Sequence, residues 1–184
     1  MKVKVVKVRE DAVIPEYASE LASGFDLVAV EDIIIAPGRT ATISTGIAFE
    51  IPPGYELQIR PRSGVSLRTN LRIANTPGTV DADYRGEVKV IVDNRANLSD
   101  YPCDTGYRID GSLVDLPVLT LDGNFTYVGE SDDPVDYAGS LVIMRGDRIA
   151  QGVICPVVRV EFEEVDELHP TERGGGGFGH TGYC

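Results

Sequence analysis

The chain has 184 residues, and 17 Lys and Arg against 29 Asp and Glu give it a net charge of −12 at pH 7. This length suits one domain with an insertion, since domains contain on the order of 150 residues. The 42% of apolar residues can supply a hydrophobic core and exclude a wholly disordered chain. Direct DNA binding is not expected, because the net charge is negative and proteins bind the DNA backbone through Lys and Arg side chains.

Membrane insertion and disulfide or zinc frameworks are not expected either. No run approaches the roughly 18–20 apolar residues of a membrane helix, and the first residues form a charged, alternating segment unlike a signal peptide. Three cysteines lack metal-ligand spacing, and only two histidines are present. We therefore expect a protein of a reducing cytoplasm.

Alternation of polar and apolar residues is the strongest pattern along the chain. It occurs in residues 2–8 and in parts of 47–60, 87–92 and 153–165, where β-branched residues dominate. This period predicts strands. Gly and Pro turn signals separate the runs and leave room for one short helix near Gly64–Asn70. The expected fold class is all-β, a sandwich or barrel.

Two segments lack this pattern. Residues 95–140 are rich in Asp, Tyr and small residues, so we interpret them as an insertion with a short hairpin around Leu116–Val128. From Thr171 onward, four successive glycines predict an arm that is mobile until a ligand orders it. The expected organisation is a β domain over residues 1–170 and a glycine-rich arm over 171–184.

Three segments could carry phosphate-binding or other polar chemistry. Arg173 opens the glycine run, whose amides can approach phosphate oxygens, and Phe178 could stack on a flat ring; a disordered tail is the alternative. The segment PRSG, residues 61–64, combines a guanidinium, a hydroxyl and free amides, as phosphate sites need, although a plain turn has the same composition. RGDRIAQG, residues 145–152, predicts a turn and a strand that carries Arg148 and Gln151.

Two further segments supply candidate carboxylates. Asp81 and Asp83 are two residues apart in GTVDADYRG and would share a face of an extended strand, a rule that fails in a tight hairpin. One of them could be a general base for water; a solvated turn is the alternative. Asp26 lies between Phe25 and Leu27, so in a strand it would face away from both.

The order of the segments is more specific than any one of them. ASGFDL, PRSG, NTPGTVDADYRGE, GDRIAQ and RGGGGFGHTG closely resemble the five ordered motifs of the trimeric dUTPases. The resemblance covers nearly the whole chain except about residues 95–140. It implies a β-jelly-roll or β-clip subunit, a homotrimer whose sites each use three chains, and Mg²⁺-assisted hydrolysis of dUTP to dUMP and pyrophosphate.

The resemblance also implies residue roles. Asp81 would be the catalytic base that aims water at the α-phosphorus, and Asp26 would reach the metal through water. Tyr84 would pack against the deoxyribose and exclude a 2′-hydroxyl. The other implied substrate-binding residues are Asn75, Gly78 and Val80 for uracil, Arg62, Ser63, Gly64 and Gln151 for the phosphates, and Arg173, Phe178, Gly179, His180 and Thr181 in the arm.

Two other functions share much of this pattern. The related dCTP deaminases bind the same nucleotide class, but the segment around Asp81 follows the hydrolase pattern. A nucleotide-switched regulatory protein is the second alternative. Some bacteriophage dUTPases carry an insert near this place that contacts repressor proteins, so residues 95–140 are either a fold-neutral decoration or a surface for a regulatory protein partner.

Overall fold

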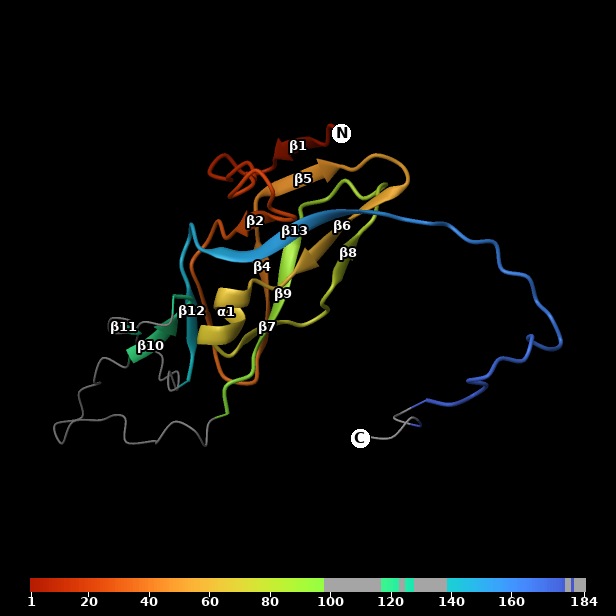
Figure 1. Cartoon of the computed structure of the whole chain (residues 1–184). Coiled ribbons are helices and arrows are strands. Elements are labelled where there is room, and N and C mark those ends of the chain that lie inside the picture. Colours follow the sequence, from red (N-terminus) through yellow and green to blue (C-terminus); the bar gives the residue numbers. More distant parts are fainter. Residues whose placement is uncertain (98–116, 123–124, 128–138, 178–179, 181–184) are drawn as a thin grey trace.

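The computed structural model describes residues 1–97, 117–122, 125–127, 139–177 and 180. Strands dominate the described residues, with one short helix against the sheets (Figure 1). The helix is α1 (Ser63–Arg68). The strands are β1 (Lys4–Lys7), β2 (Phe25–Val28), β3 (Ile33–Ile35), β4 (Thr40–Ser44), β5 (Ile47–Glu50), β6 (Tyr55–Arg60), β7 (Leu71–Ile73), β8 (Gly78–Val80), β9 (Lys89–Asn94), β10 (Pro117–Thr120), β11 (Phe125–Tyr127), β12 (Leu141–Ile143) and β13 (Arg148–Pro156).

These strands form several small sheets that enclose a common core. The order is β2-β13-β6-β8 in one sheet, β4-β9-β7 in a second and β11-β10-β12-β3 in a third, while β1 pairs with β5. Every pairing is antiparallel except that of β10 with β12. The predicted all-β class is therefore confirmed.

The core follows from the alternation in the sequence. In β9 the side chains of Val90 and Val92 are fully buried, whereas Lys89 and Ile91, which alternate with them, are exposed. Burying each such side chain stabilises the fold by roughly 1.5–3 kcal/mol. The period-two pattern therefore predicts correctly which residues of this strand face inward.

The predicted helix is confirmed, while the last strand is shorter than its sequence pattern suggests. Alternation over 153–165 predicts a strand, but β13 ends at Pro156 and residues 157–165 are exposed and form no strand. An extended segment becomes a strand only where another strand accepts its hydrogen bonds. In this chain the segment leaves the body as a long arm instead (Figure 1).

Part of the insertion belongs to the fold. The expected hairpin is present, since β10 pairs antiparallel with β11 and Val118 lies opposite Thr126. β10 also pairs with β12, and Leu121 just after it is only 7% exposed and belongs to the hydrophobic core. This segment is therefore more than a decoration on a finished domain.

Candidate active site

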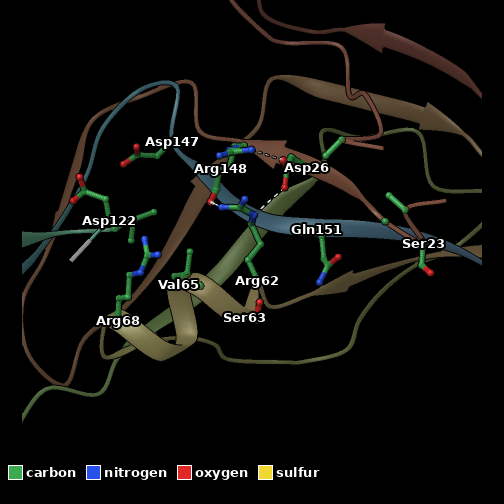
Figure 2. Close-up of a pocket in the computed structure, with 15 residues that line it drawn as sticks. Ser23, Asp26, Arg62, Ser63, Val65, Arg68, Asp122, Asp147, Arg148 and Gln151 are labelled. Atoms are coloured by element: carbon green, nitrogen blue, oxygen red, sulfur yellow. Dashed lines mark hydrogen bonds and ion pairs between the residues drawn. The ribbon is translucent and has the colours of Figure 1, made fainter. Parts of the chain in front are cut away.

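Asp26 is held at the edge of a cavity by the burial of its neighbours. In β2 the side chains of Phe25 and Leu27 are buried, while Asp26 points the other way. This is the orientation that the sequence predicts. Figure 2 shows the Asp26 carboxylate facing into a pocket beside Arg62 and Arg148.

Two arginines share the Asp26 carboxylate. Arg62 Nε lies 2.8 Å from Asp26 Oδ1, and Arg148 Nη1 lies 3.2 Å from Oδ2. Arg62 also donates through Nη1 to the backbone carbonyl of Arg148, at 3.1 Å. Charge-assisted bonds of this kind restrain both guanidinium groups. The carboxylate thus connects β2, β13 and the loop before α1.

A bulge in β13 brings Arg148 and Gln151 to the same cavity. Residues an odd number apart face opposite sides of a regular strand. The β2–β13 pairing shifts between Arg148 and Ala150, and Ile149 and Ala150 are both buried in succession. Gln151 then lies opposite Asp26, and its Nε2 donates to the carbonyl of Pro61 at 2.9 Å. Such bulges re-aim side chains.

These groups surround a cavity of about 600 Å³. It is lined by Asp26, which the resemblance assigns to the metal through water, and by the residues that it assigns to the phosphates, namely Arg62, Ser63, Gly64 and Gln151. The cavity also contains two cations without a predicted role, Arg68 and Arg148. Arg68 is five positions after Ser63 on α1, which is the only sequence signal that places it nearby.

The hairpin that carries Asp81 lines a different cavity, of about 640 Å³. β8 pairs with β6, and the chain turns directly after it, with Tyr84 N–H donating to the carbonyl of Asp81 at 3.1 Å. Because these residues form a turn, Asp81 and Tyr84 do not lie on opposite faces as a strand would place them. Both line this cavity together with Asn75, Gly78 and Val80.

Two glycines of the hairpin allow close approach of their neighbours. A Cβ on Gly78 would lie 3.2 Å from Asn75 Nδ2 and 3.3 Å from Ile59 Cβ. The Tyr84 ring packs against Gly86, and its hydroxyl donates to the carbonyl of Glu87 at 3.1 Å. The hairpin is therefore narrow at the base of β8, beside Asn75.

The arm lies away from both cavities. Figure 1 shows the chain after β13 extending far from the body. Arg173 is exposed, and its Nε donates to the carbonyl of Gly176 at 2.9 Å. His180 is likewise exposed. The predicted residues Phe178, Gly179 and Thr181 lie outside the described residues.

Within one chain, the predicted site residues therefore fall into three separate groups. The phosphate-side residues line one cavity, and Asp81 with the hairpin residues lines another. Arg173 borders neither cavity. Within one chain, no single one of these cavities is lined by residues of all three groups.

The described residues offer no protein-only metal cage. No group of three or more His, Cys, Asp or Glu side chains gathers in that part of the chain. Each oxygen of Asp26 already contacts an arginine, so this carboxylate suits contact with a metal-bound water better than direct ligation. The donor set fits a Mg²⁺ ion held mainly by phosphate oxygens and water. Across the same described residues, no helix is both long and apolar enough to span a membrane.

Comparison with known proteins identifies the family. The dUTPase family model matches residues 10–109 and 137–182, which is well over half of the chain. The chain belongs to the dUTPase family. The match omits the middle of the insertion.

Full-length relatives carry the same name. The deoxyuridine 5′-triphosphate nucleotidohydrolase of Nautilia profundicola is 42% identical over 182 residues, with 99% of each chain covered. That of Hydrogenobaculum sp. is 43% identical over 183 residues, again with 99% of each covered. These dUTPases therefore match this chain through its insertion as well.

Solved structures of phage dUTPases share the fold. The Staphylococcus bacteriophage 80alpha dUTPase with dUPNHPP is 29% identical and has a TM-score of 0.80, covering 98% of each chain. A mutant dUTPase from phage phi11 of S. aureus has a TM-score of 0.75 over 91% of this chain and 98% of its own, and is described with a structural Mg(II) ion. The predicted dUTPase fold is thereby confirmed.

Proposed function

We propose that this chain is a dUTP nucleotidohydrolase that converts dUTP and water into dUMP and pyrophosphate. Its membership in the dUTPase family supports this activity. The observation that carries the proposal is the cavity in which Asp26 restrains Arg62 beside Ser63 and Gln151. Restrained donors around one cavity suit the phosphates of a nucleotide. Such an enzyme keeps uracil out of DNA and supplies dUMP, and we expect it to act in the bacterial cytoplasm.

The active enzyme is a homotrimer in this proposal, and each site combines three chains. The separation of Asp81 from Ser63 within one chain supports this arrangement. So does the arm, where Val158 is 86% exposed, Phe162 is 92% exposed and Leu168 is 86% exposed. Apolar side chains exposed in one extended segment suit contact with another protein surface. The arm would then carry Arg173 to a neighbouring copy.

The hydrolytic step uses Asp81. Its exposed carboxylate would accept a proton from a water molecule while aiming that water at the α-phosphorus. The water oxygen forms a bond to the α-phosphorus, and the bond from this phosphorus to the bridging oxygen breaks. Pyrophosphate departs with the electron pair of the broken bond. No covalent enzyme intermediate is needed.

The phosphate cavity would stabilise the negative charge of this step. The Ser63 hydroxyl would donate to the α,β-bridging oxygen, and the Gly64 amide would lie nearby. Asp26 restrains Arg62 and thereby fixes the loop that presents Ser63. Preorganised donors avoid reorganisation when charge develops. Gln151 would contact the phosphate chain.

A Mg²⁺ ion bound to the triphosphate would neutralise phosphate charge in this negatively charged protein. Asp26 would hydrogen-bond to water on that ion. The arm completes the phosphate contacts in this proposal. Arg173 would bind the γ-phosphate, Phe178 would cover the uracil, and Gly179, His180 and Thr181 would enclose the phosphates.

The hairpin would select the base and sugar. Asn75 and the backbone of Gly78 and Val80 would hydrogen-bond to the uracil edge. Gly78 packs closely against Asn75, since a Cβ there would lie 3.2 Å from Asn75 Nδ2. In this proposal the hairpin would be too narrow for a 5-methyl group. Tyr84 lines the same cavity and would occupy the space of a 2′-hydroxyl.

Pyrophosphate release from dUTP, dTTP, UTP and dCTP, measured in parallel with Mg²⁺, tests this function. We expect rapid release from dUTP and rates at least about a hundredfold lower from the other three. The 5-methyl group of dTTP and the 2′-hydroxyl of UTP would lack space beside the hairpin, and the amino group of dCTP would leave the groups that bind the uracil edge unpaired. Ammonia release is measured from dCTP in the same series. Release of ammonia from dCTP, with no release of pyrophosphate from dUTP, would instead indicate the dCTP deaminase reaction.

A further inference from the structure

The insertion reaches the phosphate cavity. Leu121 and Asp122, which follow β10, line the same cavity as Ser63, Arg148 and Gln151. Figure 2 shows Asp122 at the end of the pocket where Arg68 also lies. The family match omits this part of the chain. The cavity wall at this end is therefore formed by a segment without an assigned role.

The position of Asp122 is fixed by the fold. Leu121 is buried in the core, and Thr120 one residue earlier lies opposite Val142 in the β10–β12 pairing. The Thr120 hydroxyl donates to Asp122 Oδ1. β12 leads through a short turn into β13, which carries Arg148. Asp122 therefore lies in the turn directly after a strand that pairs with β12.

Arg68 is the uncommitted cation of this cavity. Arg62 and Arg148 both contact Asp26, which offsets part of their charge. Arg68, in the last turn of α1, is exposed, and its side chain has no ion pair or hydrogen bond with any residue that the structure describes. A guanidinium without a partner in a phosphate cavity is available to a phosphate ligand.

We propose that Arg68 and Asp122 set the affinity of the cavity for the pyrophosphate part of the nucleotide. Arg68 attracts the terminal phosphates, and Asp122 opposes them, which limits how tightly the product pyrophosphate is held. This inference rests on the proposed hydrolysis of dUTP. It makes the insertion a part of the substrate site that weakens binding of substrate and product alike.

Opposite charge changes at the two positions provide the test. The variants are Arg68→Gln and Asp122→Asn, and the matched controls are Arg39→Gln and Glu10→Gln. These control residues are exposed and border neither the phosphate cavity nor the hairpin cavity. Steady-state hydrolysis of dUTP gives kcat and KM at fixed MgCl2. Inhibition by inorganic pyrophosphate and its direct binding by calorimetry are measured with the same proteins.

We expect Arg68→Gln to raise KM and the inhibition constant of pyrophosphate about three- to tenfold, because one attractive charge is lost from a partly solvated site. Asp122→Asn should lower both by about the same factor. The controls should differ from the unmodified enzyme by less than about twofold. Near 1 M salt, where the screening length is about 3 Å, the differences should shrink.

Equal pyrophosphate affinity in both variants and controls would overturn the inference, as would a change of both variants in the same direction. Thermal melting verifies that each variant is folded. Failure of the proposed function is a separate result, since the unmodified enzyme would then not hydrolyse dUTP at all. Direct pyrophosphate binding still tests Arg68 and Asp122 in that case.

Discussion

Arg62 Nε lies 2.8 Å from Asp26 Oδ1, and both side chains are mostly buried, with 27% and 21% of their surface exposed. The pair connects β2 to the residue directly before α1. It therefore holds Ser63, the first residue of α1, close to the sheet that carries Gln151. The ion pair orients the site as well as adding charge to it.

Asp26→Asn should lower both stability and activity. The substitution leaves the Arg62 and Arg148 guanidinium groups close together without their common carboxylate. We expect a loss of about 1–2 kcal/mol in the free energy of unfolding and at least a tenfold lower kcat/KM. Urea denaturation and dUTP hydrolysis measure the two effects. Asp166→Asn, in the exposed arm, is the control, and equal losses in both variants would contradict this role for Asp26.

Asp81→Asn should keep nucleotide binding and lose most turnover. The amide retains the size of the side chain but cannot accept a proton from water. We expect kcat to fall by about 10²–10⁴-fold with a dUTP dissociation constant within about threefold of the original. Single-turnover hydrolysis and equilibrium binding provide the comparison. An unchanged rate would remove Asp81 from its proposed role.

Tyr84→Ala should weaken the discrimination between dUTP and UTP. The aromatic ring lines the hairpin cavity, and its removal makes space for a 2′-hydroxyl. The ratio of kcat/KM values for the two substrates should fall by about tenfold or more. Tyr84→Phe keeps the ring and should retain the ratio. If the alanine variant retains it as well, another group excludes the hydroxyl.

Truncation after Glu172 should slow hydrolysis without separating the copies. The shortened chain keeps the apolar arm residues Val158 and Phe162 but loses Arg173 and the glycines. We expect kcat/KM to fall by about 10²-fold, because the phosphates lose a charged donor and the site stays open to water. Light scattering measures the assembly. A shift to single chains would indicate that the removed residues hold the assembly together.

Gly152→Ala should destabilise the fold through crowding. A Cβ at this position would lie 2.5 Å from Phe25 Cε2 and 2.9 Å from Leu57 Cδ1. Overpacking of this kind costs about 1–3 kcal/mol. Gly175→Ala introduces the same methyl group where no atom lies within 4 Å, so its stability should be unchanged. Chemical denaturation of both variants measures the difference.

The local pattern of the sequence predicted the strands and the orientation of Asp26 because both depend on neighbouring residues. Phe25 and Leu27 are buried, and alternation alone then directs Asp26 to the other face. The same rule failed for residues 157–165, because strand formation also requires a partner with free backbone groups. A partner from another part of the chain, or from another copy, leaves no local signal.

The roles of Asp122 and Arg68 could not be read from the sequence either. Asp122 reaches the cavity through the parallel pairing of β10 with β12, a contact between segments about 20 residues apart that composition does not reveal. Arg68 is at the other end of α1 from Ser63, and nothing in the sequence distinguishes it from an ordinary surface arginine. Motif order indicated the family, but only the tertiary structure shows which side chains outside the motifs share the cavity.

The irregular pairing at Ile149 and Ala150 has a consequence for anyone who shortens or redesigns β13. Deleting either residue would restore the ordinary two-residue repeat and keep Arg148 and Gln151 on one strand face, but it would remove one of two side chains that are buried in the core. The enzyme should tolerate conservative exchanges within this strand far better than a change in its length.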